Sequence, residues 1–239
     1  MTAPSVIGCD VSVWQDNNST PQQVDFNKMR SAGASFVFIK ASQANWLDQD
    51  LVYNWNNAAK AGLLRGAYHF LTFDVSPIVQ ADYFFSLMRG DTGELPLVVD
   101  FENRVTGLTR ATASNALKLF VERLQVISGR LPMIYTSPGY WNEFGTTDTL
   151  WAKYPLWLAH YTTASPLIPS PWSSWLFWQY TSHGDGLKFG AESLNIDMDY
   201  FVGTLEELYA LTGRPLPTLT WEVSIDAWAR SMGYTGVRP

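Results

Sequence analysis

The stretch Leu95-Pro96-Leu97-Val98-Val99-Asp100-Phe101-Glu102 places a short apolar run directly before two acidic residues. A run of this kind is typical of a strand that is buried on both faces, as in parallel sheets. Because strand side chains alternate between faces, Asp100 and Glu102 point to the same side, with Cα atoms roughly 6.6 Å apart. Two such carboxylates, one neutral through burial and one ionised, suit the cleavage of a glycosidic bond. Taken alone, the pattern more often marks a solvated acidic strand end, so the rest of the chain must support the catalytic interpretation.

The composition is that of a globular, acidic chain: 239 residues, 46% hydrophobic, 16% charged, with a formal net charge of −6. This length suits one α/β barrel or two smaller domains. No basic stripe points to nucleic acid, and no apolar run is long enough to span a membrane. The single cysteine, Cys9, lies in an apolar strand and is interpreted as a buried structural thiol, so no disulfide is expected. The 11 Trp and 11 Tyr residues suit a core, an interface or stacking on sugar rings.

Apolar runs predict eight strands, separated in the first part of the chain by helical patterns. The strands are expected at 5–10, 35–41, 64–70, 95–102, 131–136, 155–161, 175–180 and 196–201, and the helices at 25–32, 49–61, 76–89 and 110–128. This alternation predicts an α/β fold with a parallel sheet, and eight strands predict closure into a TIM-like barrel. The connections after Thr136, Tyr161 and Tyr180 are short or rich in Pro, Ser and Gly. We therefore expect an irregular barrel whose last three strands lack regular crossover helices.

The C-terminal segment is predicted to be an appendage. Residues 1–212 are assigned to the barrel, and 213–239 to a short Pro-containing linker followed by an amphipathic helix. The apolar face of that helix consists of Trp221, Ile225, Trp228 and Met232. So short a tail cannot fold alone. It either packs on the barrel, which is the simpler outcome, or pairs with a second chain, so we expect a monomer or a homo-oligomer mediated by this helix.

Polar or aromatic residues stand at the predicted strand ends, where barrel enzymes place their chemistry. They are Asp10, Lys40, Tyr68 with His69, Asp100 with Glu102, Tyr135, His160 with Tyr161, Gln179 with Tyr180, and Asp197. In a closed barrel they converge on one acidic pocket with aromatic walls. Singly, each has a structural alternative: His69 and His160 as core or rim histidines, and Lys40 in an ion pair.

Other site chemistries fit the sequence less well. The histidines are far apart and form no His-x-x-x-His pair, so no zinc site is expected, although carboxylates could hold a loosely bound cation. No glycine-rich phosphate loop and no Gly-x-Ser-x-Gly elbow is present. The sequence thus predicts neither a cofactor nor a resident metal.

A series of short motifs, in order along residues 5–203, resembles the glycoside hydrolase family 25 lysozymes. The motifs are Gly8-Cys9-Asp10-Val11-Ser12-Val13-Trp14-Gln15, Phe38-Ile39-Lys40-Ala41, Gly66-Ala67-Tyr68-His69-Phe70, Asp100-Phe101-Glu102, Tyr135-Thr136, Leu156-Trp157-Leu158-Ala159 with Tyr161, Trp178-Gln179-Tyr180 and Ile196-Asp197. The resemblance implies an irregular barrel of eight strands and about five helices. It also implies an N-acetylmuramidase that cuts the β-1,4 bond between N-acetylmuramic acid and N-acetylglucosamine in peptidoglycan glycan strands. Ser42-Gln43 and Asp199 depart from the usual family pattern, which bears on substrate contacts more than on activity.

The same resemblance implies roles for the matched residues. Glu102 takes the position of the acid that protonates the leaving oxygen, and Asp100 is expected to stay ionised beside the reacting ring. Asp10 and Asp197 are expected to position substrate or water. Retaining, inverting and substrate-assisted mechanisms all stay open. The expected substrate contacts are Tyr68, Tyr135, Trp157, Tyr161, Trp178, Gln179 and Lys40, although each aromatic residue could instead pack in the core.

The N-terminal residues Met1-Thr2-Ala3-Pro4 lack the basic and apolar regions of a signal peptide. With no disulfide expected, this favours a bacteriophage endolysin that is made in the host cytoplasm and reaches the cell wall by a separate phage-encoded route. A bacterial enzyme with another export route is the alternative. The competing function is a non-catalytic glycan- or wall-binding barrel module, against which the presence of all four matched acids argues.

Overall fold

The computed structural model describes residues 6–17, 19–20 and 23–216. Contacts divide the chain into two units, Met1–Thr204 and Leu205–Pro239. Helix α6 (Leu205–Thr212) begins the second unit, whereas the sequence analysis placed its boundary after this helix. The helix predicted over Trp221–Met232 lies outside the described residues, so both alternatives for the tail stay predictions.

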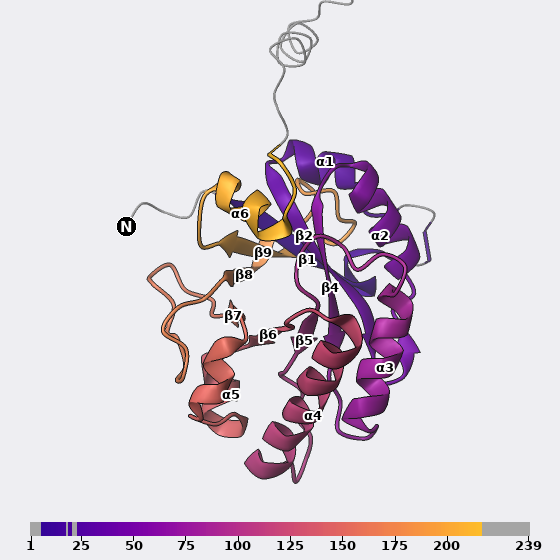
Figure 1. The fold of residues 1–239 in the computed structure, drawn as a ribbon. Helices are drawn as coiled ribbons and strands as arrows, with labels where there is room; N and C mark the ends of the chain where they lie inside the picture. Colours follow the sequence, from indigo (N-terminus) through magenta and orange to yellow (C-terminus); the bar gives the residue numbers. More distant parts are fainter. Residues whose placement is uncertain (1–5, 18, 21–22, 217–239) are drawn as a thin grey trace, which may run out of the picture. The chain divides into compact units, whose positions relative to one another are not determined.

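The first unit is a closed barrel of eight strands, as predicted (Figure 1). Its strands are β1 (Ile7–Val11), β2 (Ala34–Gln43), β4 (Leu64–Phe70), β5 (Val98–Asp100), β6 (Met133–Thr136), β7 (Leu156–Ala159), β8 (Phe177–Asp185) and β9 (Asn195–Phe201). Around the barrel the order is β1, β9, β8, β7, β6, β5, β4, β2, and a β1–β2 pair closes it. The two-residue strand β3 (Trp46–Leu47) adds a hairpin to the end of β2.

The barrel is mixed rather than uniformly parallel. Strand β9 runs antiparallel to β1 and β8, whereas the other barrel neighbours pair in parallel. A parallel pair needs a crossover of about a dozen residues or more, and the link between β8 and β9 is too short to provide one. The expectation of an all-parallel sheet is therefore wrong for β9. Its reversal brings the N-terminal end of β9, with Asp197, to the edge where the parallel strands end.

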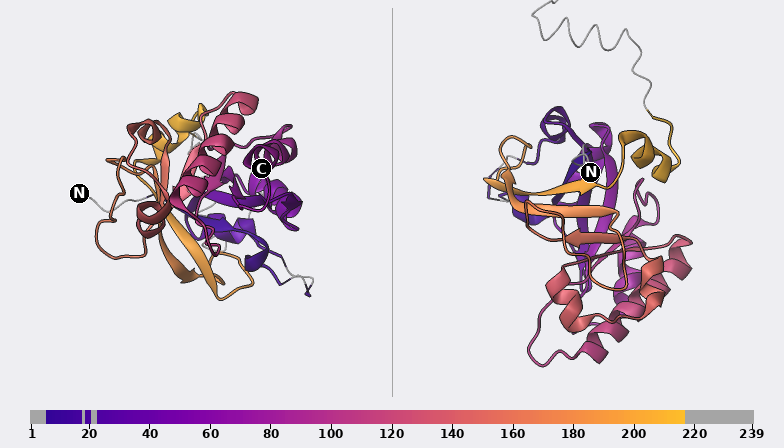
Figure 2. Two further views of the ribbon diagram at one scale, coloured as in Figure 1. Left: turned by 90° about the horizontal axis from the view of Figure 1, so that it is seen from below. Right: turned by 90° about the vertical axis from the view of Figure 1, so that its left-hand side faces the viewer.

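Four helices cover the first part of the barrel, close to their predicted bounds: α1 (Phe26–Ser31), α2 (Leu51–Lys60), α3 (Pro77–Met88) and α4 (Arg110–Ser128) (Figures 1 and 2). In α4 the Thr109 side chain caps the first turn by accepting from Thr112 N. Gly129 ends the helix with a left-handed φ of 68°, a conformation that favours glycine. Two 3₁₀ helices, η1 (Val13–Gln15) and η2 (Thr149–Lys153), complete the connections of the unit.

One helix of the barrel was not expected. Helix α5 (Pro138–Phe144) fills the connection after β6, where the sequence analysis expected none. Ser137 caps it by accepting from Tyr140 N, and Pro138 takes the first helical position. It buries Tyr140, Trp141 and Phe144, so packing rather than a long apolar stripe stabilises so short a helix. In the described chain, the connections β7–β8 and β8–β9 carry no helix, as predicted.

Aromatic side chains fill the inside of the barrel beneath the strand ends. Phe38 stacks on Trp157 with ring centroids 4.2 Å apart, and Phe36 and Phe177 meet edge to face at 5.0 Å. A Cβ atom on Gly8 would overlap the ring of Phe36, and one on Gly66 that of Phe38. Glycine at both positions thus leaves room for the rings of Phe36 and Phe38. These packed aromatic rings fill the barrel below the edge that carries the acidic residues.

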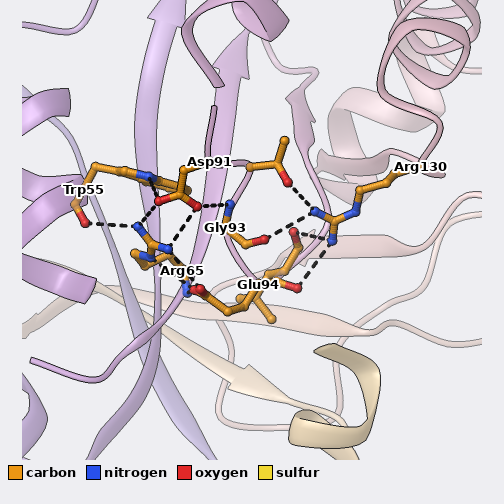
Figure 3. A network of polar contacts seen from close by, with 8 residues as sticks. Trp55, Arg65, Asp91, Gly93, Glu94 and Arg130 are labelled. Carbon is orange, nitrogen blue, oxygen red and sulfur yellow. Dashed lines mark hydrogen bonds and ion pairs between the residues drawn. The ribbon is translucent and has the colours of Figure 1, made fainter. Parts of the chain in front are cut away.

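A network of ion pairs around the buried Arg65 lies at the edge of the barrel opposite to the acidic one (Figure 3). Arg65, at the start of β4, donates to Asp91 Oδ2 at 2.7 Å and to Glu94 Oε1 at 2.9 Å, with its guanidinium over the Trp55 ring. Arg130, just after α4, donates to the Leu95 carbonyl at 3.0 Å. These contacts hold the segment that leads into β5. They therefore help to set the position of Asp100 at the end of that strand. No described helix is long and apolar enough to cross a membrane.

Candidate active site

A cavity of about 300 Å³ opens at the edge where the parallel strands end. It is lined by Asp10, Ser12, Trp14, Gln15, Lys40, Tyr68, Phe70, Asp100, Glu102, Tyr135, Trp157, Tyr161, Gln179 and Asp197. Every predicted site residue except Trp178 is therefore brought to one place. A second hollow of about 470 Å³, between the segment before α3 and helix α4, has no ionisable residue among its lining, and carries none of the predicted chemistry.

Asp100 and Glu102 enter this cavity from the end of β5, on the same side, as the strand pattern predicts. Asp100 is 6% exposed, and Glu102 lies at the exposed mouth. Burial, and then the charge of Glu102, raises the pKa of Asp100 well above its usual value. Desolvation, and then the charge of Asp197, raises the pKa of Glu102. The charge of Lys40 acts in the opposite direction on the pKa values of both Asp100 and Glu102. The pair thus keeps a proton to higher pH than free carboxyls do, as a general acid requires.

Lys40 supplies the positive charge of the site. It is 8% exposed on β2, and its Nζ donates to Gln43 Oε1 at 2.9 Å while lying 5.2 Å from the ring centroid of Phe70. Among the described residues that line the cavity, Lys40 is the one cation. Its charge favours the ionised forms of Asp100 and Glu102, so one member of that pair can ionise while the other keeps its proton.

Gln179 on β8 connects the acidic and aromatic parts of the cavity. Its Nε2 donates to Asp10 Oδ2 at 2.7 Å, and its Oε1 accepts from the hydroxyls of Tyr135 and Tyr161, both at 2.9 Å. The amide orientation is thereby fixed, and Asp10 is held in the cavity. Tyr135 is buried in the wall, whereas Tyr161 is 55% exposed at the rim.

Asp197 lies beside Asp10, its register partner across the β1–β9 pair. Burial raises the pKa of Asp197 to about 6, and the charge of His183 on β8 opposes the shift. Tyr68 and Trp157 complete the lower wall with ring centroids 6.1 Å apart. Because Trp157 is only 2% exposed, it contributes to the base of the cavity more than to an open surface.

The structure places Trp178 outside the cavity. Side chains alternate along β8, so Trp178 faces away from the side that Gln179 occupies. It is 7% exposed, donates from Nε1 to the His160 carbonyl at 2.8 Å, and packs against Trp175 and Tyr200. Its environment is that of a core residue, which was the alternative to sugar contact.

Both histidines considered at the strand ends have structural contacts. His69 is fully buried between Ser42 Oγ, 2.8 Å from its Nδ1, and Gln80 Oε1, 3.0 Å from its Nε2, and burial lowers its pKa to about 4. His160 Nδ1 accepts from Leu167 N at 3.0 Å. Neither lines the cavity.

Four lining residues were missed as site residues: Ser12, Trp14, Gln15 and Phe70. Trp14 and Gln15 belong to η1 and Ser12 caps it, and Ser12 and Gln15 form a capping box with Ser12 N donating to Gln15 Oε1 at 2.7 Å. This box places Trp14, 78% exposed, at the cavity rim. The Ser-x-x-Gln spacing was the available signal, since it predicts a helical turn directly after Asp10.

Comparison with known proteins agrees with this geometry. The sequence model of the glycosyl hydrolases family 25 matches residues 9–187. Lysozyme M1 of Streptomyces globisporus is 35% identical over 217 residues, which cover 86% of this chain and 71% of that protein. An N,O-diacetylmuramidase of Arthroderma benhamiae is 32% identical and covers 86% of each chain. The crystal structure of a bacterial lysozyme from Streptomyces coelicolor superposes with a TM-score of 0.76 at 33% identity, over 88% of this chain and 98% of that one.

Proposed function

The chain belongs to glycosyl hydrolase family 25 and is a muramidase that hydrolyses bacterial cell wall, and we propose that it cuts the β-1,4 bond between N-acetylmuramic acid and N-acetylglucosamine. The observation that carries this proposal is the pair of Asp100 and Glu102 in one cavity, with raised pKa values and Lys40 beside them. This arrangement offers both a proton donor and a negative charge to a bond placed between them.

In the proposed reaction, Glu102 gives its proton to the glycosidic oxygen as the bond from the anomeric carbon to that oxygen breaks. The positive charge that develops on the sugar ring lies beside Asp100, whose ionised form Lys40 favours. A water molecule then adds its oxygen to the anomeric carbon, and its released proton restores the acid. Asp10 and Asp197 are proposed to hold the substrate or this water, since both line the cavity from the β1–β9 side.

The aromatic wall is proposed to bind the glycan. Tyr161 is the most accessible of the predicted contacts, and its hydroxyl bond to Gln179 Oε1 holds the ring at the rim. Tyr68 and Tyr135 lie deeper, where burial and nearby carboxylates raise their pKa values, so both hydroxyls stay protonated as donors. A sugar ring in the cavity would meet these faces on one side and the acids on the other.

The test is incubation of the protein with purified peptidoglycan, followed by measurement of new reducing ends and mass spectrometry of the fragments. Fragments that end in reducing N-acetylmuramic acid support the proposal, and reducing N-acetylglucosamine would show that the other bond is cut. Wall binding without new reducing ends, on walls from several bacterial types, would instead support the non-catalytic module.

We also propose that the protein acts as a phage endolysin, made in the host cytoplasm and released to the wall by a separate route. The support is chemical: Cys9 is a free, buried thiol, so the described fold needs no oxidising compartment. Cells that express the protein should stay intact until the inner membrane is permeabilised, and should then lyse rapidly. Lysis without permeabilisation would mean that the protein crosses the membrane by a route of its own.

A further inference from the structure

Asp199 is a buried carboxyl that the proposed reaction does not use. It lies on β9, two residues after Asp197 and on the same face, with Gly8 of β1 and Gln179 of β8 as its register neighbours. It is 0% exposed and does not line the cavity. It therefore lies just behind the acids that do, because Asp10 and Asp197 pair two residues further along the same two strands.

The donors around Asp199 are few. Its Oδ1 accepts from Trp157 Nε1 at 2.7 Å. Its Oδ2 is buried and has no hydrogen-bond partner among the described residues. The nearby carboxyl is that of Asp10, because Gln179, the register neighbour of Asp199 on β8, donates from Nε2 to Asp10 Oδ2 at 2.7 Å. Burial, and then the charges of Asp197 and Asp199, raise the pKa of Asp10.

A hydrogen bond between two carboxyls requires a proton on one of them, because an ionised carboxylate only accepts. Two buried carboxylates in contact also repel strongly when both are charged, so one of them keeps its proton. Both conditions apply here, since each residue of the pair is buried and each already has one fixed donor, Trp157 for Asp199 and Gln179 for Asp10.

We propose that Asp199 is a positioning residue that shares one buried proton with Asp10 and so fixes the Asp10 carboxyl in the cavity. The chain of contacts runs from Trp157 through Asp199 and Asp10 to Gln179, and from there to the hydroxyls of Tyr135 and Tyr161. The shared proton also keeps the pair at a single negative charge beside the catalytic acids. This inference rests on the proposed function for its activity readout, but not for the proton itself.

The other ionisable groups that interact electrostatically with the pair are acidic or neutral. Asp197 on β9, Cys9 on β1 and Tyr180 on β8 interact with Asp199, and Asp197 and Asp100 interact with Asp10. The cation Lys40 on β2 instead faces Asp100, Asp48 and Glu102. No positive group of the described chain thus replaces the shared proton, which agrees with burial raising the pKa of Asp199 to about 8.

The test compares Asp199→Asn with Asp199→Leu. Asn can accept from Trp157 and donate to Asp10, so it reproduces the contacts and the single charge of the pair; we expect kcat and KM on purified peptidoglycan to stay within about threefold of wild type at pH 6 to 7. Leu does neither, so Asp10 loses its partner and kcat should fall at least about tenfold. Carbon-13 NMR of the labelled carboxyls should show one protonated carboxyl at pH 7 in the wild type that is absent in Asp199→Asn.

A matched control is Glu94→Gln, which changes a buried acid at the opposite edge of the barrel and should leave the carboxyl signals of the site unchanged. Equal losses in the Asn and Leu variants would overturn the proposal, because a need for the charge of Asp199 would then explain both. Unchanged activity in a folded Leu variant would also overturn it. So would an NMR spectrum in which Asp199→Asn removes no protonated carboxyl. That spectrum decides the matter even if Asp199→Leu does not fold, or if no wall glycan is cut.

Discussion

Asp10 on β1 and Asp197 on β9 are register partners across the antiparallel strand pair β1–β9. Their side chains lie on the same face and both enter the cavity, so the charge of Asp197 raises the pKa of Asp10, second only to burial. The same charge also raises the pKa of Glu102. The β1–β9 pairing thus brings Asp197, which is distant from Glu102 in the sequence, to a position where its charge raises the pKa of the proposed acid.

Asp197→Asn should therefore lower the pKa of Glu102. If Glu102 is the general acid, its ionisation sets the alkaline limb of activity, so that limb should move to lower pH in the variant. The measurement is the pH dependence of kcat/KM on purified peptidoglycan. An alkaline limb that stays in place would mean that another group sets it.

Lys40→Met should have the opposite effect. Met keeps an unbranched side chain of similar length against Phe70 but removes the positive charge that lowers the pKa values of Asp100 and Glu102. Both pKa values should then rise, and the pH profile should move toward higher pH. A shift in the same direction as that of Asp197→Asn would contradict the assigned electrostatics, so the two variants control each other.

Glu102→Gln should remove the proposed proton donor and leave the fold intact. The amide cannot protonate the leaving oxygen, so kcat should fall at least about 100-fold. Glu102 lies at the exposed mouth among other carboxyls, so removing its charge should not lower the melting temperature. Glu122→Gln on the exposed face of α4 is the matched control. Activity within tenfold of wild type would move the acid to another carboxyl.

Tyr161→Ala and Trp178→Ala should separate glycan binding from core packing. Tyr161 is 55% exposed at the rim, so its loss should raise KM with little change in melting temperature. Trp178 is 7% exposed and packed among aromatic rings, so its loss should cost about 3–5 kcal/mol of stability. Thermal unfolding and KM are measured on both variants. A Tyr161→Ala protein that is unfolded would place this residue in the core instead.

Local pattern was enough to predict the barrel, its first four helices and the set of residues that meet at its edge. It failed where the outcome depends on pairing or packing between distant segments. The reversal of β9 depends on the short β8–β9 link, and α5 depends on burial of Tyr140 and Trp141 rather than on its own periodicity. Which side Trp178 faces depends on the side that Gln179 faces, because neighbouring residues of a strand point to opposite faces. Gln179 points into the barrel, so Trp178 points away from it. Trp14 reaches the cavity through a capping turn that the apolar pattern does not reveal.

The buried acids also predict how stability depends on pH. The folded-state pKa values of Asp197, about 6, and Asp199, about 8, are higher than the ordinary value of about 3.9, so the folded protein binds more protons than the unfolded chain over this range. The contribution of these groups to the free energy of unfolding is therefore present at low pH. It is lost as the pH rises through their folded-state pKa values. His69 opposes this below about pH 6.5, because burial lowers its pKa to about 4.

The clear window is therefore about pH 7.5 to 8.5, where His69 is almost entirely neutral in both states, and the melting temperature should fall as pH rises across it. Asp199→Asn should flatten this slope, since the variant has no carboxyl at position 199 to ionise. Glu94→Gln should lower the melting temperature at every pH without changing the slope, because that acid lies in the Arg65 network. Calorimetry at constant ionic strength measures all three proteins. A melting temperature that rises between about pH 7.5 and 8.5 would show that the buried carboxyls are already ionised in the folded protein.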